Sequence, residues 1–399
     1  MQQDEKMTLA VVTTFPPGRG TLNEYGYHLV RALSSKVELR ELILLVDELP
    51  DGASYPPIAA QVPVRIQPCW RFGDWRNPLR ILQAVRRVQP DAVFFNLQFT
   101  SFGGNRVSAA LGLATPALVK AAGYPTAVLL HNIMETVDLA QAGFAANKLL
   151  AAVTRFFGNV MTRTLLKSDF VALTIPKYVE ILTAKYGAQN VLLAPHGAFE
   201  KLPQPPIAAT QEGTSILTFG KFGTYKVVEP LIDAVQVLRQ NGHPDVELVI
   251  AGSDSPNTPG YLANVQQQVG AQPWLTFTGY VPEMAVPNMF RQATLVAFPY
   301  TSTTGSSGVL HQAGSYGKAA VLPRIGDLAE LIADEGYTGE FFVPDKPGSL
   351  VKALARLLDD SHRRHVIERQ NYVASCSLMI EDVADWYLLH LERIIKGKE

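Results

Sequence analysis

Apolar residues in this chain form short continuous runs, which are separated by longer segments whose apolar positions repeat at helical spacing. The run Leu9–Thr14 is rich in β-branched residues, which is typical of a parallel strand that is buried on both faces. Tyr25, Leu29, Val30 and Leu33 follow at helical spacing, so we expect a helix that ends near Ser34. Further strands are expected at Leu42–Val46, Ala92–Asn96, Ala127–His131, Phe170–Leu173 and Val191–Leu193.

The alternation stops at a proline-rich tract, residues 201–213, which reads as a linker, and then begins again. We expect the second set of strands at Ser215–Phe219, Glu247–Ala251, Leu275–Phe277, Leu295–Phe298, Ala319–Leu322 and Phe341–Val343. Helices are expected at Val228–Asn241, Pro347–Leu358 and, at the C-terminus, Ile380–Ile395. Such alternation predicts doubly wound parallel sheets with right-handed crossovers.

A length of 399 residues exceeds the roughly 250–300 that one hydrophobic core usually supports. Together with the interrupted pattern, this predicts two Rossmann-like α/β domains, residues 1–205 and 206–378, followed by a C-terminal helix within 379–399. Two such domains in tandem are expected to form a binding cleft between them.

A loop of small residues, centred on Thr301–Gly308, follows the expected strand Leu295–Phe298 and precedes an expected helix at Val309–Tyr316. Open α/β sheets bind ligands at the carboxyl ends of their strands, where this loop lies. Small residues allow backbone N–H groups to approach a ligand, and a helix N-terminus favours negative charge. The loop suits a diphosphate, although an ordinary Gly/Ser-rich connection would look the same.

A second loop, Gly220–Lys226, follows the expected strand Ser215–Phe219 and leads into the helix from Val228. Lys221 and Lys226 could neutralise a diphosphate there, or they could be two solvated lysines. Since both loops follow strands of the same domain, together they favour an anion site.

The first domain offers weaker signals. Gly18 and Gly20 follow the first strand, but a Gly-x-Gly pair without a third glycine does not establish a dinucleotide site. His131 ends a strand, where it could bind a polar ligand or cap the next helix. The expected helix Ala145–Leu166 is basic and amphipathic, so it could lie on an anionic membrane, or it could be a core helix with a solvated face.

Charge and cysteine content argue against several functions for this protein. The chain has 35 basic and 36 acidic residues, a net charge of −1, so no broad positive field would attract nucleic acid. Cys69 and Cys376 form no metal or redox motif. The first six residues are too polar for a signal peptide, and Pro116, Lys120 and Pro125 break the longest apolar tract. We expect a cytoplasmic protein, with at most peripheral contact at the inner face of the membrane.

Nearly the whole chain resembles the retaining glycosyltransferases of the GT-B fold, in the large family 4 group, glycosyl transferases group 1. The resemblance is carried by Gly18–Gly20 with the following helix that contains Tyr25 and Tyr27, His131, the Ala194–Gly197 segment, Gly220–Lys226, Ala251–Ser253, Phe277–Tyr280, Phe298-Pro299, the 304–312 element and Ile325–Glu330. It implies two Rossmann-like domains that face a central cleft, with the C-terminal helix packed back on the first domain. It also implies transfer of a hexose from a nucleoside-diphosphate sugar to a hydroxyl acceptor, with no metal ion and no further cofactor.

The resemblance also assigns roles to residues. Lys221 takes the position of the family's Arg and Lys226 that of its Lys, which hold the donor diphosphate beside Gly220. The loop with Gly18 and Gly20 would close over the diphosphate, and His131 would contact the donor sugar. The remaining donor-binding positions are Thr304, Gly305, Ser306, Ser307, Gly308, Gln312 and Glu330.

One departure from the family pattern concerns its two glutamates, spaced by seven residues. Thr304 and Gln312 stand at these positions. Gln312 can still hydrogen-bond a ribose diol, but Thr304 cannot offer the charge that helps an oxocarbenium-like transition state. Glu330, Glu24 or Glu135 could compensate. In this family the leaving diphosphate itself can take the proton of the acceptor, so the departure does not abolish the mechanism.

The departure leaves other functions open. A nucleotide-sugar epimerase or hydrolase could use the same fold, and a nucleotide-sugar or glycan-binding protein would need no acid at these positions. For the enzyme, the expected partners are a nucleotide-sugar donor and a carbohydrate or lipid-linked acceptor, and not a nucleic acid.

Overall fold

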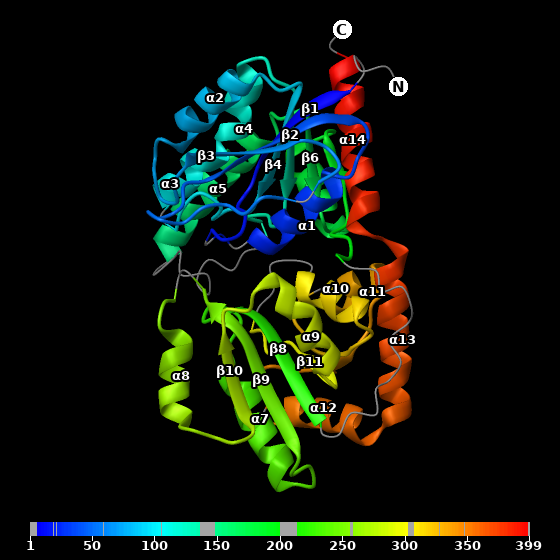
Figure 1. Ribbon diagram of the computed structural model, residues 1–399. Helices are drawn as coiled ribbons and strands as arrows, with labels where there is room; N and C mark the ends of the chain where they lie inside the picture. The colour runs from blue at the N-terminus through cyan, green and yellow to red at the C-terminus, as the bar shows by residue number, and fades with distance from the viewer. Residues whose placement is uncertain are drawn as a thin grey trace. The chain divides into compact units, whose positions relative to one another are not determined.

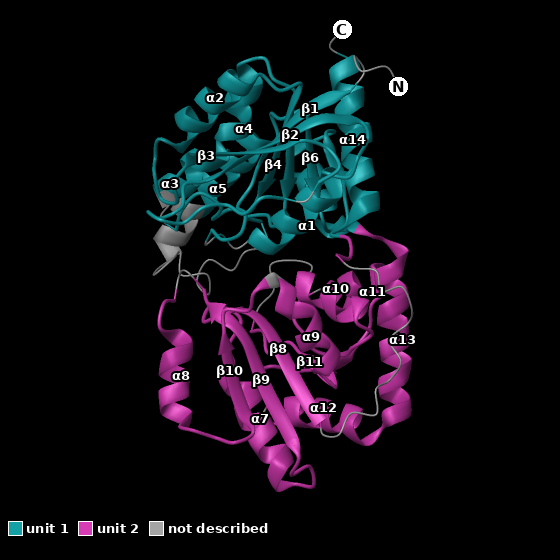
Figure 2. Ribbon diagram, in the orientation of Figure 1, with its two compact units in different colours: residues 1–196, 380–399 teal, residues 197–379 magenta. Residues whose placement is uncertain are grey.

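The chain divides into two compact α/β units: unit 1 comprises residues 1–196 and 380–399, and unit 2 comprises residues 197–379 (Figure 2). The computed structural model describes residues 6–18, 20, 22–58, 60–104, 106–135, 148–199, 214–255, 258–301, 307–326, 328–346 and 348–397. The boundary expected between residues 205 and 206, and the linker expected at 201–213, lie outside the described residues.

Unit 1 is built on a parallel sheet of seven strands, in the order β3-β2-β1-β4-β5-β6-β7 (Figure 1). The central strands β1, β4 and β5 are apolar and almost fully buried because helices cover both faces. The strands are β1 (Met7–Val12), β2 (Leu39–Asp47), β3 (Val64–Trp70), β4 (Ala92–Leu97), β5 (Thr126–Leu130), β6 (Phe170–Leu173) and β7 (Val191–Leu193).

Seven helices of unit 1 are described: α1 (Asn23–Leu33), α2 (Asn77–Val88), α3 (Arg106–Leu113), α4 (Thr115–Ala121), α5 (Lys148–Leu165), α6 (Pro176–Tyr186) and α14 (Ile380–Lys396). The last of these, α14, returns from the end of the chain and packs on α1. Tyr387 contacts Phe94 of the central strand β4, with ring centroids 4.7 Å apart. Asp385 pairs with Lys36 at 2.5 Å. The apolar face of the C-terminal helix is therefore part of the core of unit 1.

Unit 2 is built on a parallel sheet of six strands, in the order β10-β9-β8-β11-β12-β13. Its strands are β8 (Thr214–Phe222), β9 (Val246–Asp254), β10 (Leu275–Gly279), β11 (Leu295–Ala297), β12 (Ala319–Pro323) and β13 (Glu340–Phe342). Its helices are α7 (Glu229–Gln240), α8 (Tyr261–Val269), the 3-10 helix η2 (Glu283–Ala285), α9 (Val286–Gln292), α10 (Gly308–Ser315), α11 (Leu328–Asp334), α12 (Ser349–Asp359) and α13 (Ser361–Ser377). The expected class of two parallel-sheet α/β domains is confirmed.

Two elements differ from the expectation. Strand β3 was not predicted, because it is an edge strand that contains Pro68 and has no continuous buried run. Strand β8 was expected to end at Phe219 but continues to Phe222, because it pairs in register with β9 as far as Asp254. No helix in the described part of the chain is long and apolar enough to cross a bilayer.

Candidate functional site

In unit 2, the side chain of Lys226 lies over Gly220 at the carboxyl end of β8. A Cβ atom at Gly220 would lie 3.2 Å from Nζ of Lys226, a tight contact that the flexible lysine side chain would have to relieve by a small shift. The backbone of Gly220 has a φ of +140°, a conformation that other residues rarely adopt. Gly220 and Lys226, two of the residues expected at the donor site, thus lie together at the carboxyl edge of the sheet, the edge at which open α/β sheets bind ligands.

Aromatic side chains surround the ammonium group of Lys226. Nζ lies 4.7 Å from the ring centroid of Tyr300 and 5.8 Å from that of Tyr225. Lys226 also forms a backbone bridge with Tyr300, and Thr301 donates its N–H to the carbonyl of Tyr225 at 2.8 Å. These contacts join the loop after β8 to the loop after β11, so the cation keeps a defined position between them.

Lys221 is placed differently from the expectation. It lies within strand β8, opposite Ser253 of β9, and not in a loop. The extended pairing requires a second glycine in β9, since a Cβ at Gly252 would lie 1.9 Å from the carbonyl oxygen of Gly220. Lys221 is therefore held by the sheet, whereas Lys226 is held by the loop.

The beginning of α7 already carries a negative charge. A carboxylate oxygen of Glu229 accepts the N–H of Val228 at 3.1 Å and also the hydroxyl of Tyr261. Burial and this neighbouring carboxylate raise the pKa of Tyr261. The anion site expected at this helix N-terminus is thus occupied in part by the protein's own carboxylate, and Lys226 contributes the positive charge next to it.

Helix α10 begins at the end of the small-residue loop. Ser307 is its N-cap residue and Gly308 its first helical residue, whereas Thr304, Gly305 and Ser306 lie outside the described residues. Gln312 is buried in this helix, and its side-chain oxygen has no hydrogen-bond partner among the described residues. A buried acceptor without a partner costs about 1–3 kcal/mol, so a ligand hydroxyl that donates to it would be favoured.

Glu330 lies apart from this buried position. It is exposed in the first turn of α11. Of the other two candidate acids, Glu135 accepts hydrogen bonds from Lys185 at 3.2 Å and from the hydroxyl of Tyr186. Glu24 lies in the first turn of α1. Glu135 is thus engaged within unit 1.

In unit 1, a chain of polar contacts crosses the carboxyl ends of β5, β4 and β1. Nε2 of His131 lies 2.7 Å from Oδ1 of Asn96, and Nδ2 of Asn96 donates to Oγ1 of Thr13 at 3.0 Å. With the Asn96 amide oriented in this way, Nε2 of His131 carries the proton, and Nδ1 remains an acceptor. Burial lowers the pKa of His131 to about 3, so the ring is neutral near pH 7.

Aromatic residues hold the ring of His131. Tyr25 of α1 makes edge contacts with His131, at 4.5 Å between ring centroids, and with His196, at 4.7 Å. Gly18 and Gly20 lie near Asp47 and Thr14: a Cβ at Gly18 would lie 2.7 Å from a carboxylate oxygen of Asp47. A Cβ at Gly20 would lie 2.2 Å from the methyl group of Thr14. Both glycines are therefore required by close packing at this strand edge.

Sequence reasoning assigned no role to three residues that position these groups. Asn96 was available as a signal, because it is a polar residue in an otherwise apolar strand. Tyr25 was noted only as part of the helix that follows Gly18 and Gly20, and Tyr300 gave no signal, since a lone tyrosine beside a strand is compatible with an ordinary core position. Only the packing of separate segments shows that they surround Lys226 and His131.

Several solved structures resemble the whole chain. A sucrose-phosphate synthase from Thermosynechococcus elongatus has a TM-score of 0.74 at 16% identity, over 99% of this chain and 100% of that one. The Anabaena protein HepE in complex with UDP-glucose has a TM-score of 0.68 at 14% identity, over 97% and 100%. WaaG, a glycosyltransferase involved in lipopolysaccharide biosynthesis, has a TM-score of 0.67 at 12% identity, over 98% and 100%. At such low identities these similarities establish the fold.

Sequence comparison agrees with the fold for the second unit. Comparison with curated protein sequences gives no match. Residues 213–360 match the family model described as glycosyl transferases group 1, and these residues contain Gly220, Lys226 and Gln312. This chain therefore has the GT-B fold, and its residues 213–360 carry the sequence pattern of the glycosyl transferases group 1 family.

Proposed function

We propose that this protein is a retaining glycosyltransferase, which moves a hexose from a nucleoside-diphosphate sugar to a hydroxyl acceptor without a metal ion. The observation that supports this most is the ammonium group of Lys226, which is held over Gly220 at the carboxyl end of β8. A lysine beside an open glycine is suited to a diphosphate because backbone and cation can approach its oxygens together.

In this proposal, the main catalytic task is to stabilise the diphosphate as it leaves the sugar. Negative charge grows on the leaving oxygen as the glycosidic bond breaks, so a fixed cation binds the transition state more tightly than the ground state. Lys226 supplies that cation from the loop, Lys221 supplies a second one from β8, and the start of α10 at Ser307 and Gly308 faces the same charge. Glu330 is proposed to bind the donor from α11.

The buried oxygen of Gln312 is proposed to accept a hydrogen bond from a ribose hydroxyl, which would satisfy it. In unit 1, His131 is proposed to bind a sugar hydroxyl as a neutral ring. A neutral imidazole suits this role, since it can accept a hydrogen bond at Nδ1 without adding charge beside an oxocarbenium-like sugar.

The donor nucleotide is tested by thermal unfolding of the protein with UDP, GDP or ADP, in the presence of a metal chelator. HepE is a structural relative crystallised with UDP-glucose, so UDP is the first nucleotide to test. We expect one nucleotide to raise the unfolding temperature, and the matching sugar nucleotides then to be consumed when a glycan or lipid-linked acceptor is present. No shift with any nucleotide would contradict the proposal.

Turnover separates the enzyme from its alternatives. Consumption of the donor without any acceptor would indicate a hydrolase or epimerase. Tight nucleotide binding with no turnover would instead indicate a binding protein, which is the alternative that the uncharged Gln312 favours.

Replacing Lys226 by alanine should lower turnover about 10²–10³-fold, because one fixed group that stabilises transition-state charge contributes about that much. Lys352, exposed on α12, provides the matched control, and Lys352→Ala should keep wild-type turnover. Steady-state rates at saturating donor measure both variants. Near wild-type turnover in Lys226→Ala would remove this lysine from the mechanism.

A further inference from the structure

Four helices of unit 1 contain basic residues and no acidic residue. The sequences of α2–α5 have three arginines in α2, one in α3, one lysine in α4, and two arginines and a lysine in α5. They form a contiguous group, because α2 packs against α3 and α4, and α3 packs against α5 (Figure 1). Part of this positive charge is paired with acids on neighbouring elements, since Lys120 of α4 pairs with Asp169 at 3.2 Å and Arg80 of α2 pairs with Glu48 and Asp74. Arg86 and Arg87 of α2 are exposed.

The same group of elements exposes large apolar side chains. Six of them are 54–65% exposed: Phe72, Trp75, Leu79, Val107, Phe156 and Phe157. In the rest of the described part of unit 1, only Val37 and Leu389 have large apolar side chains that are more than half exposed. We call the six residues, with the exposed Arg86 and Arg87 of α2, the α2–α5 surface. Phe72 and Trp75 lie in the loop before α2, and the other four lie on helices of the packed group. Exposed apolar side chains that gather on neighbouring elements commonly mark an interaction surface.

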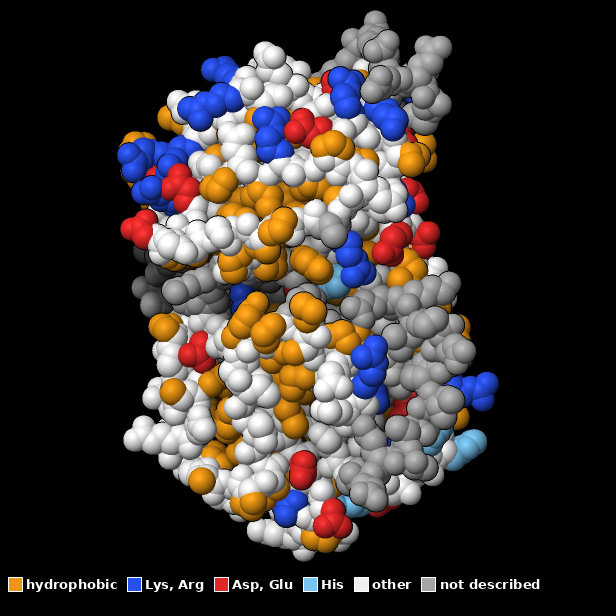
Figure 3. Space-filling view, in the orientation of Figure 1, with side chains coloured by type: hydrophobic (Ala, Val, Ile, Leu, Met, Phe, Trp, Pro, Cys, Tyr) orange, Lys and Arg blue, Asp and Glu red, His pale blue; other side chains and the backbone are white. Residues whose placement is uncertain are grey.

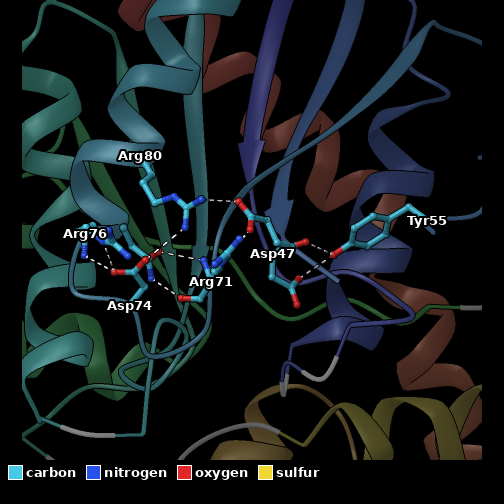
Figure 4. A network of polar contacts seen from close by, with 8 residues as sticks. Asp47, Tyr55, Arg71, Asp74, Arg76 and Arg80 are labelled. Atoms are coloured by element: carbon cyan, nitrogen blue, oxygen red, sulfur yellow. Dashed lines mark hydrogen bonds and ion pairs between the residues drawn. The ribbon is translucent and has the colours of Figure 1, made fainter. Parts of the chain in front are cut away.

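The loop that carries Phe72 and Trp75 is held by a network of side chains (Figure 4). Asn77, which is fully buried, accepts the N–H of Arg71 at 3.0 Å and donates to the carbonyl of Arg71 at 2.7 Å. Asp74 accepts the N–H of Arg76 at 2.9 Å. Gly73 donates to the carbonyl of Phe102 at 2.8 Å. These hydrogen bonds hold the backbone of the loop in place. The held loop leaves both aromatic side chains exposed.

The acidic groups near this loop are balanced by arginines. Arg80 bridges Glu48 at 2.5 Å and Asp74 at 3.3 Å, and Arg71 and Arg76 contact the same two carboxylates. Three arginines thus face three acids, because Asp51 also interacts electrostatically with Arg71. In the space-filling view, Lys and Arg side chains gather on the side of unit 1 where α2 and α3 lie, together with hydrophobic side chains and with Asp and Glu side chains among them (Figure 3).

We propose that the α2–α5 surface docks on an anionic lipid membrane, with Phe72 and Trp75 inserted among the headgroups. Aromatic side chains favour the interface because they offer an apolar body with a polarisable edge, and nearby arginines attract anionic lipid. A single glycan would stack on one or two aromatic rings, but it would not account for aliphatic exposure on α2 and α3 or for four helices without acids. The proposal does not depend on sugar transfer.

Binding is tested with the full chain and vesicles of phosphatidylcholine, with or without phosphatidylglycerol. We expect the protein to sediment with the anionic vesicles and not with the neutral ones. High salt should release it from the anionic vesicles. Trp75 is the most exposed of the four tryptophans, so its emission should shift to shorter wavelength on binding. Failure to bind anionic vesicles, or equal binding to neutral ones, would overturn the proposal.

Two double variants with similar loss of exposed apolar surface locate the contact. Phe72→Ser with Trp75→Ser should lower vesicle partitioning by at least about tenfold, because two aromatic side chains lose their burial in the interface. Tyr280→Ser with Met284→Ser, which removes exposed apolar groups from unit 2, should leave partitioning unchanged. Equal partitioning of the two double variants would overturn the proposal. A shift of Trp75 emission with soluble oligosaccharides but not with vesicles would instead assign the surface to glycan.

Arginine substitutions test the charge contribution separately. Arg86→Gln with Arg87→Gln should lower partitioning about fivefold for each charge removed, since one basic residue near an anionic membrane contributes about 1 kcal/mol. Partitioning that matches the wild type would contradict the electrostatic part. All variants change exposed residues, so thermal unfolding should confirm that each one folds as the wild type does.

Discussion

At the scale of single residues, burial and hydrogen bonding together define the state of His131. Asn96 accepts its Nε2 proton, and burial lowers its pKa to about 3. The side chain is thus a neutral hydrogen-bonding group near pH 7. Lys226 is the counterpart in unit 2, where aromatic faces and an open glycine position a cation.

The lowered pKa of His131 predicts a specific sensitivity to acid. Between its folded pKa of about 3 and its unfolded pKa of about 6.5, the unfolded chain binds a proton that the folded chain does not. Stability should therefore fall as the pH is lowered through this window, by up to about 2 kcal/mol between pH 7 and pH 5. Because glutamine does not titrate, the His131→Gln variant should lose less of its free energy of unfolding between pH 7 and pH 5 than the wild type does.

Urea unfolding at pH 7 and pH 5 measures this effect. His362→Gln, on the exposed face of α13, is the control and should keep the wild-type difference between the two pH values. If His131→Gln kept that difference as well, the ring would not be the group that titrates.

At the scale of elements, the pairing of β8 with β9 determines where Gly220 and Lys221, two of the proposed donor-binding residues, lie. The register runs without interruption from Thr214 to Phe222. Gly220 and Gly252 are opposite each other in this register, and both have positive φ. Their lack of side chains lets the two strands stay paired to the sheet edge, which places Lys221 in the strand and directs the following turn toward Tyr300.

Substitution of Gly252 by alanine should break this end of the pairing. Its Cβ would lie 1.9 Å from the carbonyl oxygen of Gly220, and its φ of +137° is also unfavourable for alanine. We expect a loss of more than about 3 kcal/mol in the free energy of unfolding, together with loss of nucleotide binding.

Gly242→Ala separates the two causes. Gly242 also has a positive φ, of +110°, but a Cβ there would meet no atom within 4 Å. It should cost only about 1–2 kcal/mol, from backbone strain alone, and leave nucleotide binding intact. Equal losses in the two variants, measured by urea unfolding, would exclude the contact as the cause.

At the scale of the whole molecule, unit 1 is completed by a segment distant in sequence, whereas unit 2 is one continuous stretch, residues 197–379. Unit 1 ends at residue 196 and takes its last helix from residues 380–399. Tyr387 and Leu391 of α14 are buried there, and Trp386 contacts Phe170 at 6.0 Å between ring centroids. The stability of unit 1 therefore depends on the presence of α14.

Truncation after Met379 should therefore expose the core of unit 1 and leave the core of unit 2 intact. Hydrogen exchange should increase across β1, β4 and α1, while β8 and β9 remain protected. Truncation after Lys396 is the control, since it keeps all of α14. Protection of β1 and β4 in the shorter chain would show that α14 is dispensable.

Local sequence signals were sufficient for most of the fold. Strands such as β4 and β6 are continuous apolar runs whose burial on both faces follows from their composition. The periodic helices α7 and α12 also begin and end near their expected limits. These features depend on neighbours in sequence, so local periodicity was enough to find them. Strand β3 was not predicted, because an edge strand needs no continuous apolar run.

The sequence by itself determined two parallel α/β units, because the alternation of strands and helices predicts parallel sheets, and it placed Gly220 and Lys226 on one segment at the carboxyl end of a strand. Only the tertiary structure decided which side chains surround these groups. Tyr300 reaches Lys226 from another loop, Asn96 reaches His131 from another strand, and α14 enters unit 1 from the far end of the chain. The physical reason is that such contacts join residues far apart in sequence, and their energies depend on packing that no local pattern records.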